Sequence, residues 1–84
     1  MLTVYTTSWC GYCLRLKRQL EREGILFTEV NIETDESAAE LVMLANGGNR
    51  TVPTVVLPNG VSMTNPSLTQ VKAGLSEVTS LPTT

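Results

Sequence analysis

Two short stretches of alternating residues, on either side of an amphipathic helix, constrain the fold of this 84-residue chain most strongly. Residues 2–6 (LTVYT) and 26–32 (LFTEVNI) are β-rich and alternate as strands do. Between them, from about Gly11 to Glu23, apolar residues recur at steps of three and four, which places them on one helix face. A strand, a helix and a strand in this order predict two parallel strands joined by a right-handed crossover.

A second helix is predicted over about residues 35–45. Thr34 or Asp35 is suited to cap its start, and the NGGN stretch at 46–49 ends it. Apolar residues at helical spacing give the stripe that we expect to be buried, which consists of Ala38, Leu41, Val42 and Ala45.

The last third of the chain predicts a hairpin and then a third helix. VPTVVL (52–57) has the pattern of a strand, PNG (58–60) indicates a two-residue turn, and VSMT (61–64) is the returning strand. In the last helix, Asn65 is the expected N-cap and Pro66 the first helical residue. Its apolar stripe consists of Leu68, Val71, Leu75 and Val78.

The element order is therefore β-α-β-α-β-β-α. It predicts an α/β fold with one four-stranded mixed sheet covered by three helices. We expect a single domain over residues 1–79 and a flexible tail at 80–84.

Composition excludes several classes of function. A net charge of −2 argues against nucleic-acid binding, which needs a basic face. No apolar run approaches the roughly 20 residues of a membrane span, and the start of the chain (MLTVYTT) lacks the pattern of a secretory signal. One tight pair of cysteines in such a chain indicates a reducing cytoplasm and redox work.

The two cysteines, Cys10 and Cys13, are separated by two residues in SWCGYC. A closed zinc site needs four ligands, usually Cys or His, and the chain has no histidine, so we expect no metal site. A site shared between two chains stays open. A purely structural disulfide would close too short a loop to stabilise the fold much. Buried inert thiols do not explain a pair placed at a strand-to-helix junction.

A reactive thiol pair explains the placement better. Cys10 directly precedes the first predicted helix, whose unpaired N–H groups and dipole stabilise a thiolate. Cys13 lies one turn further on, where we expect it to be more buried, less acidic and still within reach of Cys10. Cys10 is therefore the predicted attacking thiol and Cys13 the resolving one. Trp9 and Tyr12, beside them, are expected to line a substrate groove.

A second informative motif is RTVPT, residues 50–54. Proline at the start of a strand cannot donate to the ladder, and the simplest explanation is a strand start with an ordinary trans bond. The alternative is a cis bond before Pro53, which would turn the preceding carbonyl and N–H outward. Val52 would then give an extended thiol substrate a backbone edge to pair with.

The whole chain resembles the glutaredoxins. The resemblance rests on WCGYC after the first strand, TVPT before the third, PNG in the hairpin and a polar turn before the last helix. More broadly, the chain resembles the thioredoxin fold. The resemblance implies that Cys10 forms a mixed disulfide with a small thiol, and that Cys13 is its partner. It also implies that Thr51, Val52 and a cis Pro53 dock the backbone of that thiol.

The chain departs from glutaredoxins at the two places that bind glutathione. That family usually has Gly-Gly, then Cys or Ser and Asp, before the last helix, and a basic residue before the first cysteine. Here the turn is TNPS (64–67), in which Pro66 has no N–H, and no lysine precedes Cys10. A less charged, hydroxyl-rich thiol would suit the polar side chains that remain, which are Thr51, Asn65 and Ser67.

NGGNRTVPT together with MTNPS looks most like the mycoredoxins of actinobacteria, which use mycothiol, a cysteinyl pseudo-disaccharide. This resemblance implies a cytoplasmic, monomeric thiol–disulfide oxidoreductase that reduces protein–mycothiol mixed disulfides. It implies no tightly bound cofactor, mycothiol as co-substrate, mycothiolated proteins as partners and recycling by a mycothiol disulfide reductase. Further contacts with the small thiol are expected from Arg15 and Arg50.

Two other functions stay open at this point. One is a glutathione-type glutaredoxin or a general dithiol electron donor. The other is an iron–sulfur carrier, in which a dimer holds one cluster through Cys10 of each chain and two small thiols. Gly11, a residue other than proline after the first cysteine, is compatible with the carrier.

Overall fold

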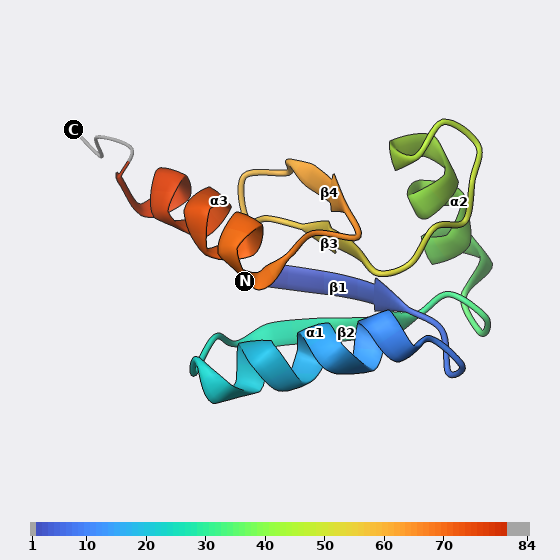
Figure 1. Ribbon diagram of the computed structural model, residues 1–84. Helices are drawn as coiled ribbons and strands as arrows, with labels where there is room; N and C mark the ends of the chain where they lie inside the picture. The colour runs from blue at the N-terminus through green and yellow to red at the C-terminus, as the bar shows by residue number, and fades with distance from the viewer. Residues whose placement is uncertain (1, 81–84) are drawn as a thin grey trace.

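The computed structural model describes residues 2–80, and the side chains of residues 2–76 (Figure 1). The elements follow the predicted order and are β1 (Leu2–Thr6), α1 (Gly11–Arg22), β2 (Phe27–Asn31), α2 (Glu36–Ala45), β3 (Thr54–Val56), β4 (Ser62–Thr64) and α3 (Leu68–Ser80). Helix α3 runs through Ser80, and the rest of the tail expected at 80–84 lies outside the described residues. The side chain of Val78 is also outside them.

The four strands form one mixed sheet in the order β2-β1-β3-β4. Strands β1 and β2 are parallel, and their register pairs Thr6 with Asn31 at the carboxyl ends. Strand β3 is antiparallel to β1, with Val55 opposite Val4, and β4 is antiparallel to β3, with Met63 opposite Val55. The predicted thioredoxin-like fold is confirmed. Because β1 and β2 are parallel, the loops that follow them leave the sheet at the same edge.

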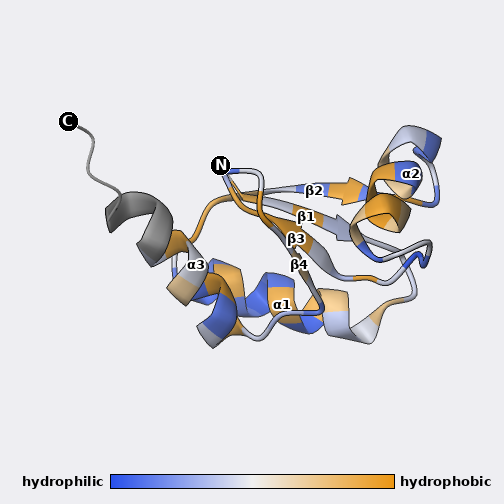
Figure 2. Ribbon diagram, turned by 90° about the horizontal axis from the view of Figure 1, so that it is seen from above, coloured by the Kyte–Doolittle hydropathy of each residue, from blue (hydrophilic) through white to orange (hydrophobic). Residues whose placement is uncertain are grey.

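The helices cover both faces of the sheet. Helices α1 and α3 lie together on one face and α2 lies on the other (Figure 2). The core under α1 and α3 consists of Leu2, Val4, Leu16, Leu20, Val55, Leu57 and Val71. The smaller core under α2 consists of Ile32, Ala38, Ala39 and Val42. Among the described residues, no helix is long and apolar enough to cross a membrane.

Helix α2 buries a different face from the one expected. Ala38, Ala39 and Val42 are buried, whereas Leu41 is 43% exposed and Ala45 is also exposed. The prediction was half wrong because the helix carries apolar residues on all of its faces. Their spacing therefore does not show which face is buried. The small side chains of Ala38 and Ala39, at successive positions, face the core under α2 instead. The predicted cap was correct, because the Asp35 carboxylate accepts from the Ala38 N–H at 3.0 Å.

The hairpin turn is longer than predicted. The Leu57 N–H donates to the Val61 carbonyl at 2.8 Å across three residues rather than two. Gly60 has a φ of +88°, the left-handed conformation that closes a three-residue hairpin loop. Strand β3 is shorter than expected, because Val52 and Pro53 precede the ladder and belong to the loop.

The start of α3 also differs from the prediction. The Ser67 hydroxyl accepts from the Gln70 N–H at 3.1 Å, and the Gln70 side chain accepts from the Ser67 N–H at 2.8 Å. This reciprocal pair is a capping box, so Ser67 caps the helix and Asn65 does not. Asn65 instead has a φ of +44°, a left-handed conformation that asparagine adopts more readily than most residues.

We expect Leu20→Ala to lower the free energy of unfolding by about 2–5 kcal/mol, because it leaves a cavity in the larger core. Leu20 is fully buried, whereas Leu14, on the same helix, is 45% exposed. Leu14→Ala is therefore the matched control and should cost much less. Urea unfolding followed by circular dichroism measures both, and equal losses would contradict this description of the core.

Candidate functional site

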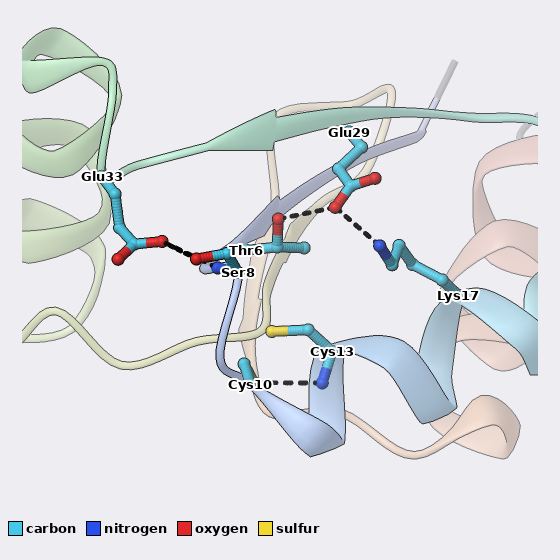
Figure 3. A network of polar contacts seen from close by, with 7 residues as sticks. All are labelled: Thr6, Ser8, Cys10, Cys13, Lys17, Glu29 and Glu33. Atoms are coloured by element: carbon cyan, nitrogen blue, oxygen red, sulfur yellow. Dashed lines mark hydrogen bonds and ion pairs between the residues drawn. The ribbon is translucent and has the colours of Figure 1, made fainter.

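Cys10 is the N-cap of α1, with an extended backbone (φ −86°, ψ 109°). Its sulfur takes the position usually held by a serine or aspartate oxygen, and accepts from the Cys13 N–H at 3.1 Å (Figure 3). The Leu14 N–H donates to the Cys10 carbonyl at 3.2 Å, so the helix begins directly at this residue. Sγ of Cys10 therefore lies at the positive end of the helix dipole, where negative charge is favoured.

Cys13 is the more deeply buried of the two cysteines, and its thiol is a weak acid. Cys13 is 1% exposed and Cys10 is 9% exposed, and no disulfide joins them. Burial, reinforced by the neighbouring Cys10, raises the pKa of the Cys13 thiol from 9.0 to about 12. Lys17 and the Thr7 backbone act in the opposite direction but do not offset the burial. At neutral pH Cys13 is therefore a protonated thiol.

The TVP segment lies directly against Cys10, although the two are far apart in the sequence. The Val52–Pro53 peptide bond is cis, and the Cys10 thiol lies 3.8 Å from the Val52 carbonyl oxygen. Two further bonds fix the segment: Thr54 Oγ1 donates to the Thr51 carbonyl at 2.7 Å, and the Asn65 N–H donates to the Pro53 carbonyl at 2.7 Å. The two sequence motifs therefore meet at one place.

The Asn46 side chain connects α2, β3 and β4, and the sequence did not single it out. Its Nδ2 donates to the Val42 carbonyl at 2.8 Å and to Thr54 Oγ1 at 3.0 Å, while its Oδ1 accepts from the Thr64 hydroxyl. The end of α2 is thereby joined to β3 and β4. An asparagine after a helix is a common cap, but its long-range partners are set by the tertiary fold.

Residues 65–67 of the turn before α3 have no spare backbone donor. The Asn65 N–H is bonded to the Pro53 carbonyl, Pro66 has no N–H, and the Ser67 N–H is bonded to the Gln70 side chain. An anionic group that approached this turn would therefore find three successive backbone positions without a free N–H.

Two clefts flank the start of α1. The first, of about 290 Å³, is lined by Tyr12, Arg15, Leu16, Gln19, Asn65, Pro66, Ser67, Leu68 and Gln70. It brings together four of the residues predicted as ligand contacts. The second, of about 230 Å³, is lined by Thr7, Ser8, Trp9, Cys10, Gly11, Cys13, Leu14, Lys17 and Glu29.

Trp9 and Tyr12 are 75% and 67% exposed, so both aromatic rings stand beside the thiols without being part of a core. Arg50 is exposed beside the TVP segment and lines neither cleft.

Two carboxylates lie near the end of β1 (Figure 3). Glu29 Oε2 accepts from Lys17 Nζ and from the Thr6 hydroxyl, each at 2.8 Å, and these bonds lower the pKa of Glu29. Glu33 Oε1 accepts from the Ser8 hydroxyl at 2.6 Å and from the Ser8 N–H at 2.8 Å, and these bonds lower the pKa of Glu33. Both carboxylates are ionised at neutral pH. Within the part of the chain described, no group of three or more Cys, Asp or Glu side chains is placed to hold a metal ion.

A thioredoxin-like fold with a Cys-X-X-Cys pair at a helix start defines a thiol–disulfide oxidoreductase, and the comparisons specify the family. The glutaredoxin family profile matches residues 2–62. A Mycobacterium tuberculosis protein named as a candidate glutaredoxin is 57% identical over 77 residues, which cover 92% of each chain. Mycoredoxin 1 of Corynebacterium glutamicum is 40% identical over 72 residues, which cover 86% of this chain and 89% of that one.

A solved structure agrees with these similarities in sequence. The glutaredoxin of Archaeoglobus fulgidus superposes with a TM-score of 0.72 at 26% identity, over 86% of this chain and 82% of that one. The chain therefore belongs to the glutaredoxin family and is a glutaredoxin-like thiol–disulfide oxidoreductase.

In the native reduced protein at about pH 8, we expect iodoacetamide to modify Cys10 and to leave Cys13 unmodified. Alkylation needs the thiolate, and the pKa of about 12 together with 1% exposure keeps Cys13 protonated and covered. Peptide mass mapping measures the two sites, with the urea-unfolded protein as the control in which both react. Equal labelling of the two cysteines in the native protein would show that Cys13 is neither covered nor held in the protonated form.

Proposed function

We propose that this protein reduces mixed disulfides between protein cysteines and mycothiol. The observation that carries the choice of thiol is the turn before α3, where Asn65, Pro66 and Ser67 have no free N–H for a carboxylate. Glutathione has two carboxylates, whereas mycothiol presents hydroxyl groups. The similarity to a protein named mycoredoxin 1 supports the same choice.

Cys10 is the proposed nucleophile, because its sulfur is at the helix start and accepts the Cys13 N–H. Its thiolate attacks the mycothiol sulfur of the mixed disulfide. The bond between mycothiol and the protein cysteine breaks, and the protein cysteine leaves as a thiolate and takes up a proton. The protein cysteine is reduced, and Cys10 now carries mycothiol through a new disulfide.

A second mycothiol then resolves this intermediate. Its thiolate attacks the mycothiol sulfur bound to Cys10, which releases mycothiol disulfide and restores the Cys10 thiolate. The second mycothiol is thus oxidised as the protein cysteine is reduced, and a mycothiol disulfide reductase would return both mycothiol molecules to the thiol form. Attack by Cys13 instead would release mycothiol and leave an internal disulfide. Because Cys13 is buried and has a raised pKa, we expect this second route to be slower.

Two surfaces next to Cys10 are proposed to hold the small thiol. The backbone at Thr51 and Val52 pairs with the extended cysteinyl part, by strand addition. The cleft that Tyr12, Arg15 and Ser67 line takes the hydroxyl-rich sugar part. Trp9, Asn65 and Arg50 are proposed as further contacts at the rim. No resident cofactor takes part, and the protein is proposed to act as a monomer in the cytoplasm.

Turnover of one carrier protein, prepared as its mycothiol and its glutathione mixed disulfide, tests the choice of thiol. Each form is assayed with its own recycling system. We expect kcat/KM to be at least about tenfold higher for the mycothiol form, because glutathione carboxylates would stay unpaired at the turn. A preference for glutathione would identify a glutathione-type glutaredoxin. Absorbance near 420 nm after anaerobic purification would instead favour an iron–sulfur carrier.

The two cysteines should differ in their contribution to turnover of the mycothiol form. We expect Cys10→Ser to lower kcat by at least about a hundredfold, because no other nucleophile is at the helix start. Cys13→Ser should keep most of the activity, since a second mycothiol resolves the intermediate. Equal losses in the two variants would show that the dithiol route is obligatory. Circular dichroism of both variants checks that they are folded.

A further inference from the structure

We propose that Glu33 determines the charge preference of the site, by holding a carboxylate next to the segment that carries Cys10. It disfavours thiol substrates with an anionic group and leaves neutral ones unaffected. This inference deepens the proposed function and rests on Cys10 as the nucleophile. Glu33 touches neither cysteine, and it acts through its charge and through its contact with Ser8.

The fold fixes the backbone of Glu33. Strands β1 and β2 are parallel and end side by side, and the Ile32 N–H donates to the Thr6 carbonyl at 2.9 Å just beyond the last pair. The Asn31 side chain then accepts from the Glu33 N–H at 2.8 Å, and the Asn31 carbonyl accepts from the Thr34 hydroxyl at 3.3 Å. Glu33 thus leaves the sheet at the same edge as the loop that leads to Cys10.

The carboxylate is fixed to that loop by two short bonds. Oε1 of Glu33 accepts both the N–H and the hydroxyl of Ser8, at 2.8 and 2.6 Å (Figure 3). Ser8 is two residues before Cys10, and the Cys10 N–H donates back to the Thr7 carbonyl at 3.4 Å. Two residues span at most about 7 Å, so the carboxylate oxygen lies within about 10 Å of the Cys10 backbone nitrogen. That separation is close to the Debye length of about 8 Å at physiological salt.

The negative charge of Glu33 is not neutralised by a neighbouring cation. Lys17, the cation that lines the cleft beside Cys10, is bonded to Glu29. Within residues 2–76, Glu33 forms no ion pair, and its hydrogen bonds to Ser8 favour the ionised form. An anionic thiol that approaches Cys10 therefore meets a fixed like charge, whereas mycothiol, which has no carboxylate, does not.

Three small thiols of similar size test this directly. One peptide is prepared as its mixed disulfide with 2-mercaptoethanol, which is neutral, with 2-mercaptoethanesulfonate, which is anionic, and with cysteamine, which is cationic. Single-turnover release of the peptide thiol is measured at low salt and about pH 7, for the unmodified protein and for Glu33→Gln. Glutamine keeps an oxygen that accepts from Ser8, so this variant removes the charge and retains the contact.

We expect Glu33→Gln to speed the anionic substrate about two- to threefold, to slow the cationic one by a similar factor and to leave the neutral one unchanged. This is the size of a unit-charge interaction over roughly 8 Å in water. The effect should shrink at about 0.5 M salt. Glu40→Gln, an exposed residue of α2 with the same change of charge, is the matched control and should alter none of the three rates.

Glu33→Ala separates the two effects of the residue, because it removes the contact with Ser8 as well as the charge. We expect it to slow the neutral substrate too, since the loop before Cys10 loses its anchor. An equal change of all three rates in Glu33→Gln, or no change in any, would overturn the charge preference. These probes contain neither mycothiol nor glutathione, so this result is independent of which of those two thiols the protein prefers.

Discussion

The hydrogen bond from the Cys13 N–H to the Cys10 sulfur is the contact on which the chemistry of this protein depends. It places a sulfur where a helix start needs an acceptor, so the same bond that caps α1 also stabilises negative charge on the thiol. Cys13 contributes its backbone to this arrangement, while its own sulfur is buried and protonated at neutral pH. One turn of helix thus uses the sulfur of Cys10 and the backbone N–H of Cys13 in a single contact.

Everything else near Cys10 reaches it from loops at one end of the sheet. Strands β1 and β2 end together, which brings Glu33 to Ser8, and the TVP segment enters from before β3. Asn46 joins the end of α2 to β3 and β4, and Thr54, which it contacts, donates to the Thr51 carbonyl in the segment opposite Cys10. The sheet therefore positions these loops, and we propose that the groups on the loops select the substrate. Residues 65–67 present an amide and a hydroxyl without a free backbone N–H, Glu33 adds a carboxylate, and Arg50 adds a positive charge.

The order of elements, the sheet and the meeting of the two motifs were predictable, because strand and helix periodicities differ and the Cys-X-X-Cys pair has few structural explanations. The buried face of α2 could not be predicted, because Leu41 and Val42 are both strongly apolar. Only the packing of Val42 in the core with Ile32 distinguishes them. At the start of α3, both Asn65 and Ser67 are suitable caps, and the choice depends on the Asn65 bond to Pro53. The contacts of Glu33 and Asn46 could not be predicted from the sequence, because Ser8, Thr54 and Thr64, their partners, are set by the tertiary fold.

The most direct test of the central claim is a competition for Cys10 in a single turnover. The Cys13→Ser variant is mixed with equal amounts of one protein as its mycothiol and its glutathione mixed disulfide, and intact mass spectrometry identifies the thiol bound to Cys10. We expect the mycothiol adduct to dominate, because residues 65–67 before α3 have no free N–H and Glu33 adds a negative charge nearby. A dominant glutathione adduct, or equal amounts of the two, would show that these features do not select the substrate.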